Sequence, residues 1–198
     1  MIKAIIFDLS GVCSNNEEPP FVQQFALKHH LPLQEFEQDY LHLIVTAERD
    51  QISGTQVWEK LAKKYAVAID IPKTIKEMIE QKVFYPELLH LASSLRKRYH
   101  TAVLSNYNKT YWDLISKKID LSKYFDVVLI SYQIKARKDS PLGFQKFLQQ
   151  FKIKPQEALY FDDTKHNLAT PASLGLKTIH FLNKAQLLKE MKKYGITF

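Results

Sequence analysis

The second half of the sequence alternates short apolar runs with longer segments whose apolar residues recur at helical spacing. The apolar runs are TAVLS (101–105), DVVLIS (126–131), ALYFD (158–162) and KTIHF (177–181). Short strands of this kind, separated by amphipathic helices, predict a parallel sheet covered by helices on both faces. Residues 2–7 are expected to join this sheet, because a single strand is not stable alone.

Residues 14–85 interrupt this alternation and have the periodicity of helices. Their apolar stripes are Phe21/Phe25, Phe36/Tyr40/Ile44, Val57/Leu61 and Ile75/Ile79/Val83. Ser53 with Gln56 predicts a capping box at the start of the third helix, and Pro72 fits the first turn of the fourth. We therefore expect an α/β chain with two parts. Residues 1–13 and 86–198 would form a doubly wound core domain, and residues 14–85 an inserted helical cap domain.

Composition narrows the class of protein. Of the 198 residues, 45% are hydrophobic and 25% are charged, as in globular domains. No segment approaches the roughly 18 apolar residues of a membrane span, and Lys3 is followed by a short run that soon meets Asp8, unlike a secretory signal. The one cysteine, Cys13, excludes an internal disulfide and a cysteine-rich zinc site. We expect a cytoplasmic protein, as a monomer or homodimer, without a membrane partner.

The net charge is +7, from 28 basic and 21 acidic residues. The basic residues lie in small groups, and the sequence contains no zinc finger, RNA-binding signature or long basic tail. This pattern favours solvated helix faces with an anion-accepting pocket over nucleic-acid binding.

Polar residues follow the predicted strands at the places where the strands end. In parallel α/β sheets, ligands bind at the carboxyl ends of the strands. Each of these residues alone could cap a helix or belong to a loop, but together they predict one functional site. The residues are Asp8, Ser105, Asn106, Asp162 and Asp163, with Lys138 in the stretch that follows the third strand.

Four segments carry a resemblance to a known family. FDLSG, VLSNYN, RKDSPLGFQKF and YFDDTKHNLATPASLG are similar to the four motifs of the haloacid dehalogenase (HAD) superfamily of hydrolases. The resemblance covers the whole chain and implies a Rossmann-like core with a helical type-1 cap between the first two motifs. ERDQISGTQVWEKL (48–61) and residues 85–108 resemble a bacterial sugar-phosphatase branch and the phosphatase domain of soluble epoxide hydrolases.

This resemblance implies Mg²⁺-dependent hydrolysis of a small phosphorylated metabolite. Asp8 would attack phosphorus and form an aspartyl-phosphate, which water then hydrolyses. The Asp8 carboxylate, the backbone carbonyl of Ser10 and Asp163 would bind Mg²⁺, with Asp162 bound directly or through water.

The resemblance assigns further residues to the phosphoryl group and to the metal loop. Ser105 and the amide of Asn106 would bind phosphoryl oxygens, and Lys138 would stabilise the nucleophile and the developing charge. Asn167 would hold the metal loop together. The remaining candidates have structural interpretations: Lys135 and Arg137 at the surface, His166 in a loop and Cys13 among buried apolar residues.

Ser10 is the main departure from the family pattern. Most phosphatases of the superfamily carry an acid there, which protonates the leaving oxygen and later deprotonates the attacking water. A serine hydroxyl does both poorly, and the loss of such a group costs roughly 10²–10⁴ in rate. Asp139 in place of the usual proline after Lys138 is a smaller departure.

Several alternatives stay open at this point. The chain could be a phosphatase that uses water, a cap side chain or a self-protonating leaving group, and Ser10→Asp should then speed turnover if the missing acid limits the rate. It could instead hold a long-lived phosphoenzyme, or be a binding protein that has lost activity. A 2-haloacid dehalogenase is less favoured, because those relatives lack the paired acids Asp162 and Asp163 and use no Mg²⁺.

Overall fold

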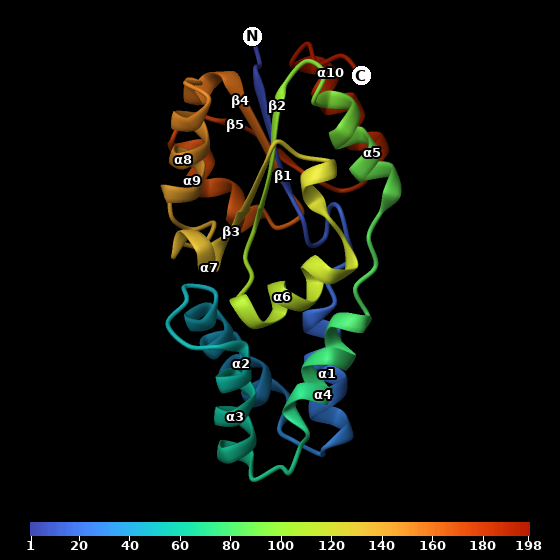
Figure 1. The fold of residues 1–198 in the computed structure, drawn as a ribbon, viewed down its shortest axis with the longest axis vertical. Coiled ribbons are helices and arrows are strands. Elements are labelled where there is room, and N and C mark those ends of the chain that lie inside the picture. Colours follow the sequence, from blue (N-terminus) through green and yellow to red (C-terminus); the bar gives the residue numbers. More distant parts are fainter.

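The computed structural model describes residues 1–198 and contains one five-stranded parallel sheet (Figure 1). Its order is β3-β2-β1-β4-β5, so the first strand of the chain lies at the centre. The predicted doubly wound α/β fold is confirmed. The strands are β1 (Ala4–Asp8), β2 (His100–Ser105), β3 (Val127–Ile130), β4 (Ala158–Asp162) and β5 (Lys177–His180).

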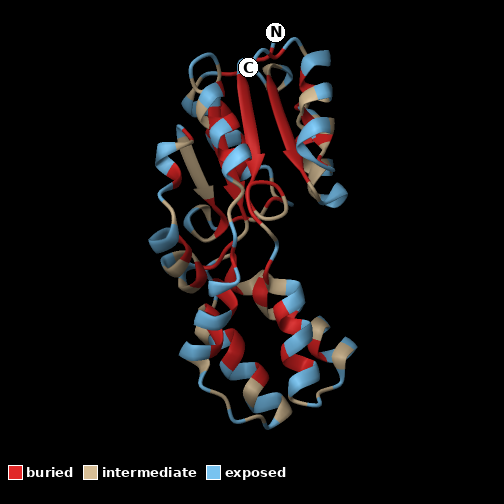
Figure 2. Cartoon of the chain, turned by 90° about the vertical axis from the view of Figure 1, so that its right-hand side faces the viewer, coloured by how far each residue is buried: buried red, intermediate tan, exposed pale blue.

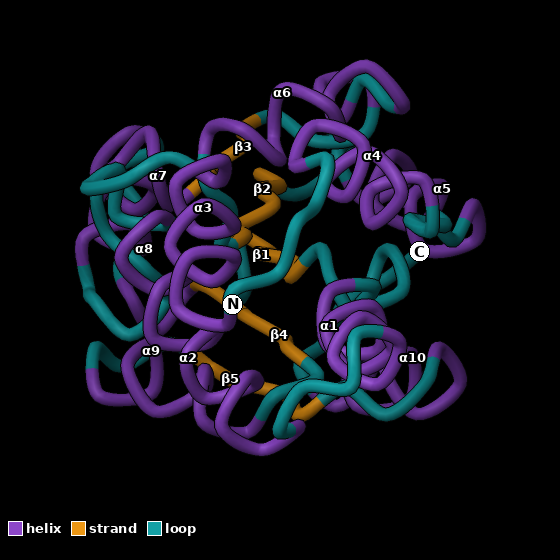
Figure 3. Tube along the Cα trace, turned by 90° about the horizontal axis from the view of Figure 1, so that it is seen from below, coloured by secondary structure: helices purple, strands orange, loops and turns teal.

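Helices cover both faces of the sheet because the central strands are apolar on both sides. On one face, Ile5, Phe7 and Phe161 belong to the core that includes residues of α5 (Pro86–Leu95) and α10 (Lys184–Lys193). On the other face, Ile6 and Tyr160 pack in the core of α8 (Leu142–Gln150). Figure 3 shows α8 and α9 (Ala169–Ser173) on one side of the strands and α5 and α10 on the other.

Four helices lie beyond the carboxyl ends of the strands (Figure 1). Figure 2 shows that their buried residues face one another. Trp58 is fully buried at their centre and lies within 6.5 Å of the rings of Phe21, Phe25, Phe36 and Tyr40. The helices are α1 (Glu18–Lys28), α2 (Leu33–Ala47), α3 (Gly54–Tyr65) and α4 (Ile71–Glu80).

The predicted helix starts are confirmed, whereas one predicted helix end is wrong. Ser53 and Gln56 form the capping box of α3, and Pro72 lies in the first turn of α4. Val83 does not belong to the stripe of the fourth helix, because α4 ends at Glu80 and Val83 is 58% exposed. The backbone of Val83 pairs instead with Asn15, through hydrogen bonds of 3.0 and 2.8 Å, so its side chain points outward.

The two connections between the sheet and α1–α4 run side by side. Ser14 forms a β-bridge with Phe84, and the Tyr85 amide donates to the Cys13 carbonyl at 2.8 Å. The other helices are α6 (Lys109–Lys118) and α7 (Ser131–Ile134), with 3₁₀ turns at Leu121–Lys123, Pro155–Glu157 and Lys165–Leu168. No helix is both long and apolar enough to span a membrane.

Candidate active site

The sheet brings the predicted site residues together at the carboxyl ends of its strands. Asp8, Ser105 and Asp162 are the last residues of β1, β2 and β4, and register places Asp8 beside Leu104 of β2. A cavity of about 380 Å³ opens at this edge, between the sheet and the helices α1 and α2. Of the predicted site residues, Asp8, Ser10, Ser105, Asn106, Lys138 and Asp163 line this cavity. Asp162 lies beneath it and is fully buried.

Lys138 joins two of the three site carboxylates. Its Nζ donates to Asp8 Oδ1 and, at 3.0 Å, to Asp162 Oδ2, while its backbone amide donates to Asn106 Oδ1 at 3.0 Å. Burial alone would lower the pKa of Lys138, but the charges of Asp8 and Asp162 raise it above its ordinary value. Lys138 is therefore a fixed cation. Asp8 Oδ1 also accepts from the Leu9 amide, whereas Asp8 Oδ2 accepts no hydrogen bond from the protein.

Asp162 is held rigidly by its neighbours. It accepts from the Tyr160 hydroxyl, from the Thr164 amide at 2.8 Å and from Asn167 Nδ2 at 3.0 and 3.1 Å. Burial opposes ionisation, but Lys138 and these donors lower the pKa of Asp162. Asn167 thus makes a contact of the kind expected for a residue that holds this loop together.

The three carboxylates form a cluster that suits a divalent cation. One oxygen each of Asp8, Asp162 and Asp163 lie within 4.8 Å of one another. Burial raises the pKa of Asp8, and burial together with Asp162 raises that of Asp163. A single lysine does not balance three carboxylates, so negative charge is left over. Oxygen ligands with this charge are what Mg²⁺ prefers.

Gly11 brings the loop after β1 against Asp163. Its φ is +86°, and a Cβ at this position would collide with the Asp163 carboxylate. Only glycine fits such a close approach in this backbone conformation. The Asp163 backbone is held from the other side by His180 Nε2, 2.9 Å from its carbonyl.

Ser10 belongs to a polar cluster that sequence reasoning missed. Its Oγ lies 2.7 Å from the Tyr107 hydroxyl and accepts from Lys82 Nζ at 3.0 Å. Lys82 Nζ also donates to Glu17 Oε2 at 2.6 Å and to the Asn15 carbonyl at 2.9 Å. The side chains of Lys82 and Glu17 are wholly buried. Lys82 lies within the helix predicted from the stripe Ile75/Ile79/Val83 and has no motif around it, so no sequence signal indicates its burial.

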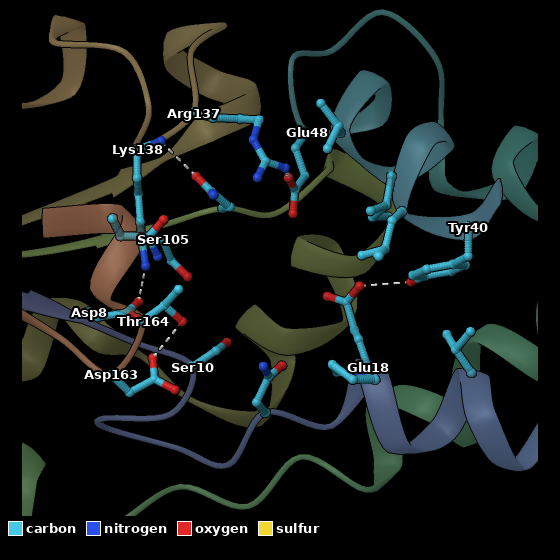
Figure 4. A pocket seen from close by; sticks show the side chains of 18 of the residues that line it. Asp8, Ser10, Glu18, Tyr40, Glu48, Ser105, Arg137, Lys138, Asp163 and Thr164 are labelled. Carbon is cyan, nitrogen blue, oxygen red and sulfur yellow. Dashed lines mark hydrogen bonds and ion pairs between the residues drawn. The ribbon is translucent and has the colours of Figure 1, made fainter. Parts of the chain in front are cut away.

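The wall opposite Asp8 consists mainly of residues from α1 and α2, with Arg137 from the loop after α7 (Figure 4). Glu18 Oε2 accepts from the Tyr40 hydroxyl at 2.7 Å, and Glu48 pairs with Arg137 Nη1. The expectation of a surface role for Arg137 is wrong, because its ion pair with Glu48 turns the side chain into the cavity wall and leaves it only 21% exposed. Lys135 is exposed and Cys13 is buried, as predicted. His166, which was expected in a loop, is exposed and lies in the 3₁₀ turn Lys165–Leu168.

The cavity wall gives a testable pH dependence of stability. Burial, with the charges of Glu17 and Glu48, raises the pKa of Glu18 from 4.5 to about 8. The folded protein then binds a proton more tightly than the unfolded chain, so this group lowers stability progressively as pH rises from about 4.5 to about 8. Glu18→Gln should remove this loss, so its Tm should exceed that of the wild type at pH 9 but not at pH 4. Each kcal/mol of regained stability should raise Tm by roughly 2–4 °C.

Thermal unfolding at both pH values measures this difference, with the exposed Glu59→Gln as the matched control. Equal pH dependence of Tm in Glu18→Gln and wild type would contradict the assignment.

Together, the parallel sheet and the lysine-paired carboxylates at its edge define an α/β enzyme with a metal-compatible acidic centre. The sequence matches the haloacid dehalogenase-like hydrolase family over residues 2–175. The chain belongs to this family, as the four motifs predicted.

Relatives that align along most of the chain carry phosphatase names. A D-ribitol-5-phosphate phosphatase of Bacteroides thetaiotaomicron is 26% identical, over 96% of this chain and 97% of the relative. A phosphorylated carbohydrates phosphatase of Thermotoga maritima is 23% identical, over 96% and 91%. The fold is similar to that of a HAD family enzyme of B. thetaiotaomicron in complex with magnesium and inorganic phosphate. That structure has a TM-score of 0.77 and 22% identity, and the alignment covers 94% of this chain and 99% of the other.

Proposed function

We propose that this hydrolase is a Mg²⁺-dependent phosphatase of small phosphorylated metabolites, with Asp8 as its nucleophile. The observation that carries the proposal is the arrangement at the sheet edge. Asp8 Oδ1 is held by Lys138, while Asp8 Oδ2 accepts no hydrogen bond from the protein, and Asp8 lines the cavity together with Asp163. The relatives named phosphatases of ribitol phosphate and of phosphorylated carbohydrates support a sugar or polyol phosphate as substrate.

In the proposed reaction, Asp8 Oδ2 attacks phosphorus and the ester P–O bond breaks. The leaving oxygen takes the electron pair and gains a proton from solvent water. Water then attacks the phosphorus of the aspartyl-phosphate, which frees Asp8 and inorganic phosphate. Lys138 favours the ionised form of Asp8 against the opposing effect of burial, and its positive charge favours the approach of an anionic phosphate.

Other residues of the edge would bind the phosphoryl group and the metal. Ser105 lies at the end of β2 and is 1% exposed. Ser105 and the Asn106 amide line the cavity and would bind the phosphoryl oxygens. Asp8, the Ser10 carbonyl and Asp163 would hold Mg²⁺, with Asp162 bound directly or through water. When bound, Mg²⁺ neutralises the repulsion between the nucleophile and the phosphate dianion. Residues 14–85 would act as the cap domain that closes the cavity.

The proposal is tested by phosphate release from an aryl phosphate and a panel of sugar and polyol phosphates. We expect turnover with Mg²⁺ and none with chelator. Absence of metal-dependent release from every substrate would contradict the proposal.

Two other functions are distinguished by the same acidic cluster. Dehalogenation is less favoured because Asp162 and Asp163 accompany Asp8, and 2-haloacids without metal test it directly. A binding protein without activity is tested by thermal shift. Mg²⁺ with beryllofluoride, which mimics the aspartyl-phosphate, should raise Tm if Asp8 and its partners are competent. No change in Tm would favour the inactive alternative.

Ser10→Asp should raise kcat if leaving-group protonation limits the rate. The gain is expected for alkyl phosphates, whose leaving oxygens are strongly basic, and not for a nitrophenyl phosphate, whose leaving oxygen needs no proton. Lys82 lies close enough to pair with the new carboxylate and hold it ionised, so we expect a gain below the usual roughly 10²–10⁴-fold.

Comparison of kcat for the two substrate types measures this effect, with Ser10→Asn as the neutral control of similar size. An unchanged or lower kcat with alkyl phosphates would show that another group protonates the leaving oxygen.

A further inference from the structure

The active-site cavity is lined by different groups at its two ends (Figure 4). At the sheet edge, Lys138, Ser105 and Asn106 offer a cation and polar groups for an anion, beside the carboxylates Asp8 and Asp163 that would hold Mg²⁺. Across the cavity, the lining residues contributed by α1, α2 and the residue after α2 include three carboxyl groups, those of Glu18, Glu37 and Glu48. The part of a substrate beyond its phosphate would therefore lie among acids.

Glu18 is positioned to accept a hydrogen bond from a ligand. The Tyr40 hydroxyl, itself 3.4 Å from the Tyr111 hydroxyl, donates to Glu18 Oε2 and orients the carboxyl group. Glu18 Oε1 has no hydrogen-bond partner in the protein and lies on the cavity wall. A free acceptor oxygen beside an oriented tyrosine matches the hydroxyl group of an alcohol or sugar.

The only cation on this wall is already balanced by acids. Arg137 Nη1 pairs with Glu48 Oε2, and Arg137 Nε lies 3.8 Å from Asp139 Oδ2. Arg137 Nε makes no hydrogen bond, and no partner contacts Glu48 Oε1. The Arg137–Glu48 pair thus offers an acceptor, Glu48 Oε1, to a hydroxyl, while the net charge of the ionised pair is close to zero.

The pKa values of these carboxyl groups show that a negative charge is unfavourable in this part of the cavity. Burial is the largest cause of the raised pKa values of Glu18, about 8, and Glu48, about 7. The charges of Glu17 and Glu48 raise the pKa of Glu18 further, and Asp139 acts in the same direction on Glu48. A carboxylate or second phosphate of a ligand would meet the same poorly solvated, acidic surroundings.

We propose that the substrate's leaving group is an uncharged polyhydroxyl alcohol, and that Glu18 and Glu48 bind its hydroxyls and exclude a second anionic group. This inference rests on the proposed phosphatase function. It adds that the cavity wall formed by α1 and α2 selects substrates by the charge of their leaving group. Above the pKa of Glu18, about 8, and that of Glu48, about 7, a hydroxyl can donate to the free carboxylate oxygens, whereas an anion at the same place is repelled. The cavity of about 380 Å³ has the size of a small-metabolite site.

The test uses two phosphate monoesters that differ only at the far end. Sorbitol 6-phosphate ends in a hydroxymethyl group, and 6-phosphogluconate has a carboxylate at that carbon. With Mg²⁺ at pH 9, above the pKa values of Glu18 and Glu48, we expect kcat/KM to be at least about tenfold higher for sorbitol 6-phosphate in the wild type. Equal values, or a preference for 6-phosphogluconate, would overturn the inference.

Two variants assign the selection to named side chains. Glu18→Gln keeps the hydrogen bond from Tyr40 but cannot ionise, and Glu48→Gln frees Arg137 from its partner. Each should lower the ratio of kcat/KM values to about threefold or less. Glu59→Gln, an exposed change on α3, should leave the ratio unchanged. An unchanged ratio in both cavity variants would overturn the assignment.

Hydrolysis of an aryl phosphate tests the proposed phosphatase function independently of the charge selection. If the wild type hydrolyses the aryl phosphate with Mg²⁺ but does not distinguish the two substrates, the charge selection alone is wrong. If it hydrolyses none of the three, the proposed function and this inference fail together.

Discussion

Asp8→Asn is expected to abolish phosphate release, with a fall in kcat of at least about 10³-fold. The amide is not a nucleophile and cannot form the aspartyl-phosphate. The fold should survive, because asparagine has nearly the same shape and removes a buried charge from beside Asp162 and Asp163. Desolvation and these neighbours already raise the pKa of Asp8, so we expect Tm to be unchanged or higher. Phosphate release and thermal unfolding measure the two effects.

Asp113→Asn is the control for Asp8→Asn, because Asp113 lies on the surface of α6 and pairs only with Lys109. Its activity should equal that of the wild type. Retention of a tenth of the wild-type rate in Asp8→Asn would show that another group attacks phosphorus. Acid-quenched wild type should also carry a phosphoryl group that Asp8→Asn lacks.

Lys82→Met is expected to cause the largest loss of stability, about 3–5 kcal/mol in the free energy of unfolding. Lys82 and Glu17 are both wholly buried, so the variant leaves the Glu17 carboxylate without its cation. Lys82 also joins the two connections between the sheet and α1–α4, because its Nζ donates to the Asn15 carbonyl. Urea unfolding of the variant and the wild type measures the loss.

The double variant Lys82→Met/Glu17→Gln should recover most of this stability, because no unpaired charge then remains and the new amide side chain can still contact the Tyr107 hydroxyl, as Glu17 does. Lys117→Met, a change at an exposed lysine of α6, should alter stability by less than about 0.5 kcal/mol. A loss of similar size in the single and double variants would show that packing, and not the charge pair, carries the effect.

Much of the fold was predictable because local patterns and tertiary structure agree. The apolar runs at 101–105, 126–131, 158–162 and 177–181 match the strands β2 to β5 to within one residue at each end. The central strand β4 is apolar because both of its faces are buried. Helix starts followed from side-chain capping at Ser53 and from Pro72. The end of α4 was missed, because Val83 continues the apolar spacing while long-range pairing with Asn15 decides its conformation.

The acidic half of the site was predictable for a similar reason. Asp8 and Asp162 end strands of a parallel sheet, so the topology alone places them at one edge, with Asp163 following β4. The opposite half was not. Glu18 and Tyr40 come from helices whose sequence pattern predicts packing, Glu48 directly follows α2, and Arg137 was expected at the surface.

By itself, the sequence determined the α/β class, the family and the carboxylates that meet Lys138. Strand periodicity, chain order and motif spacing can be read from the sequence without knowledge of long-range contacts. Only the tertiary structure decided the surroundings of Ser10 and the charge of the cavity wall. Lys82 reaches Ser10 across 72 residues of chain, and Arg137 reaches Glu48 across 89. Such pairs depend on how the two connections orient α1–α4 over the sheet, and burial then changes the ionisation of the side chains that meet there.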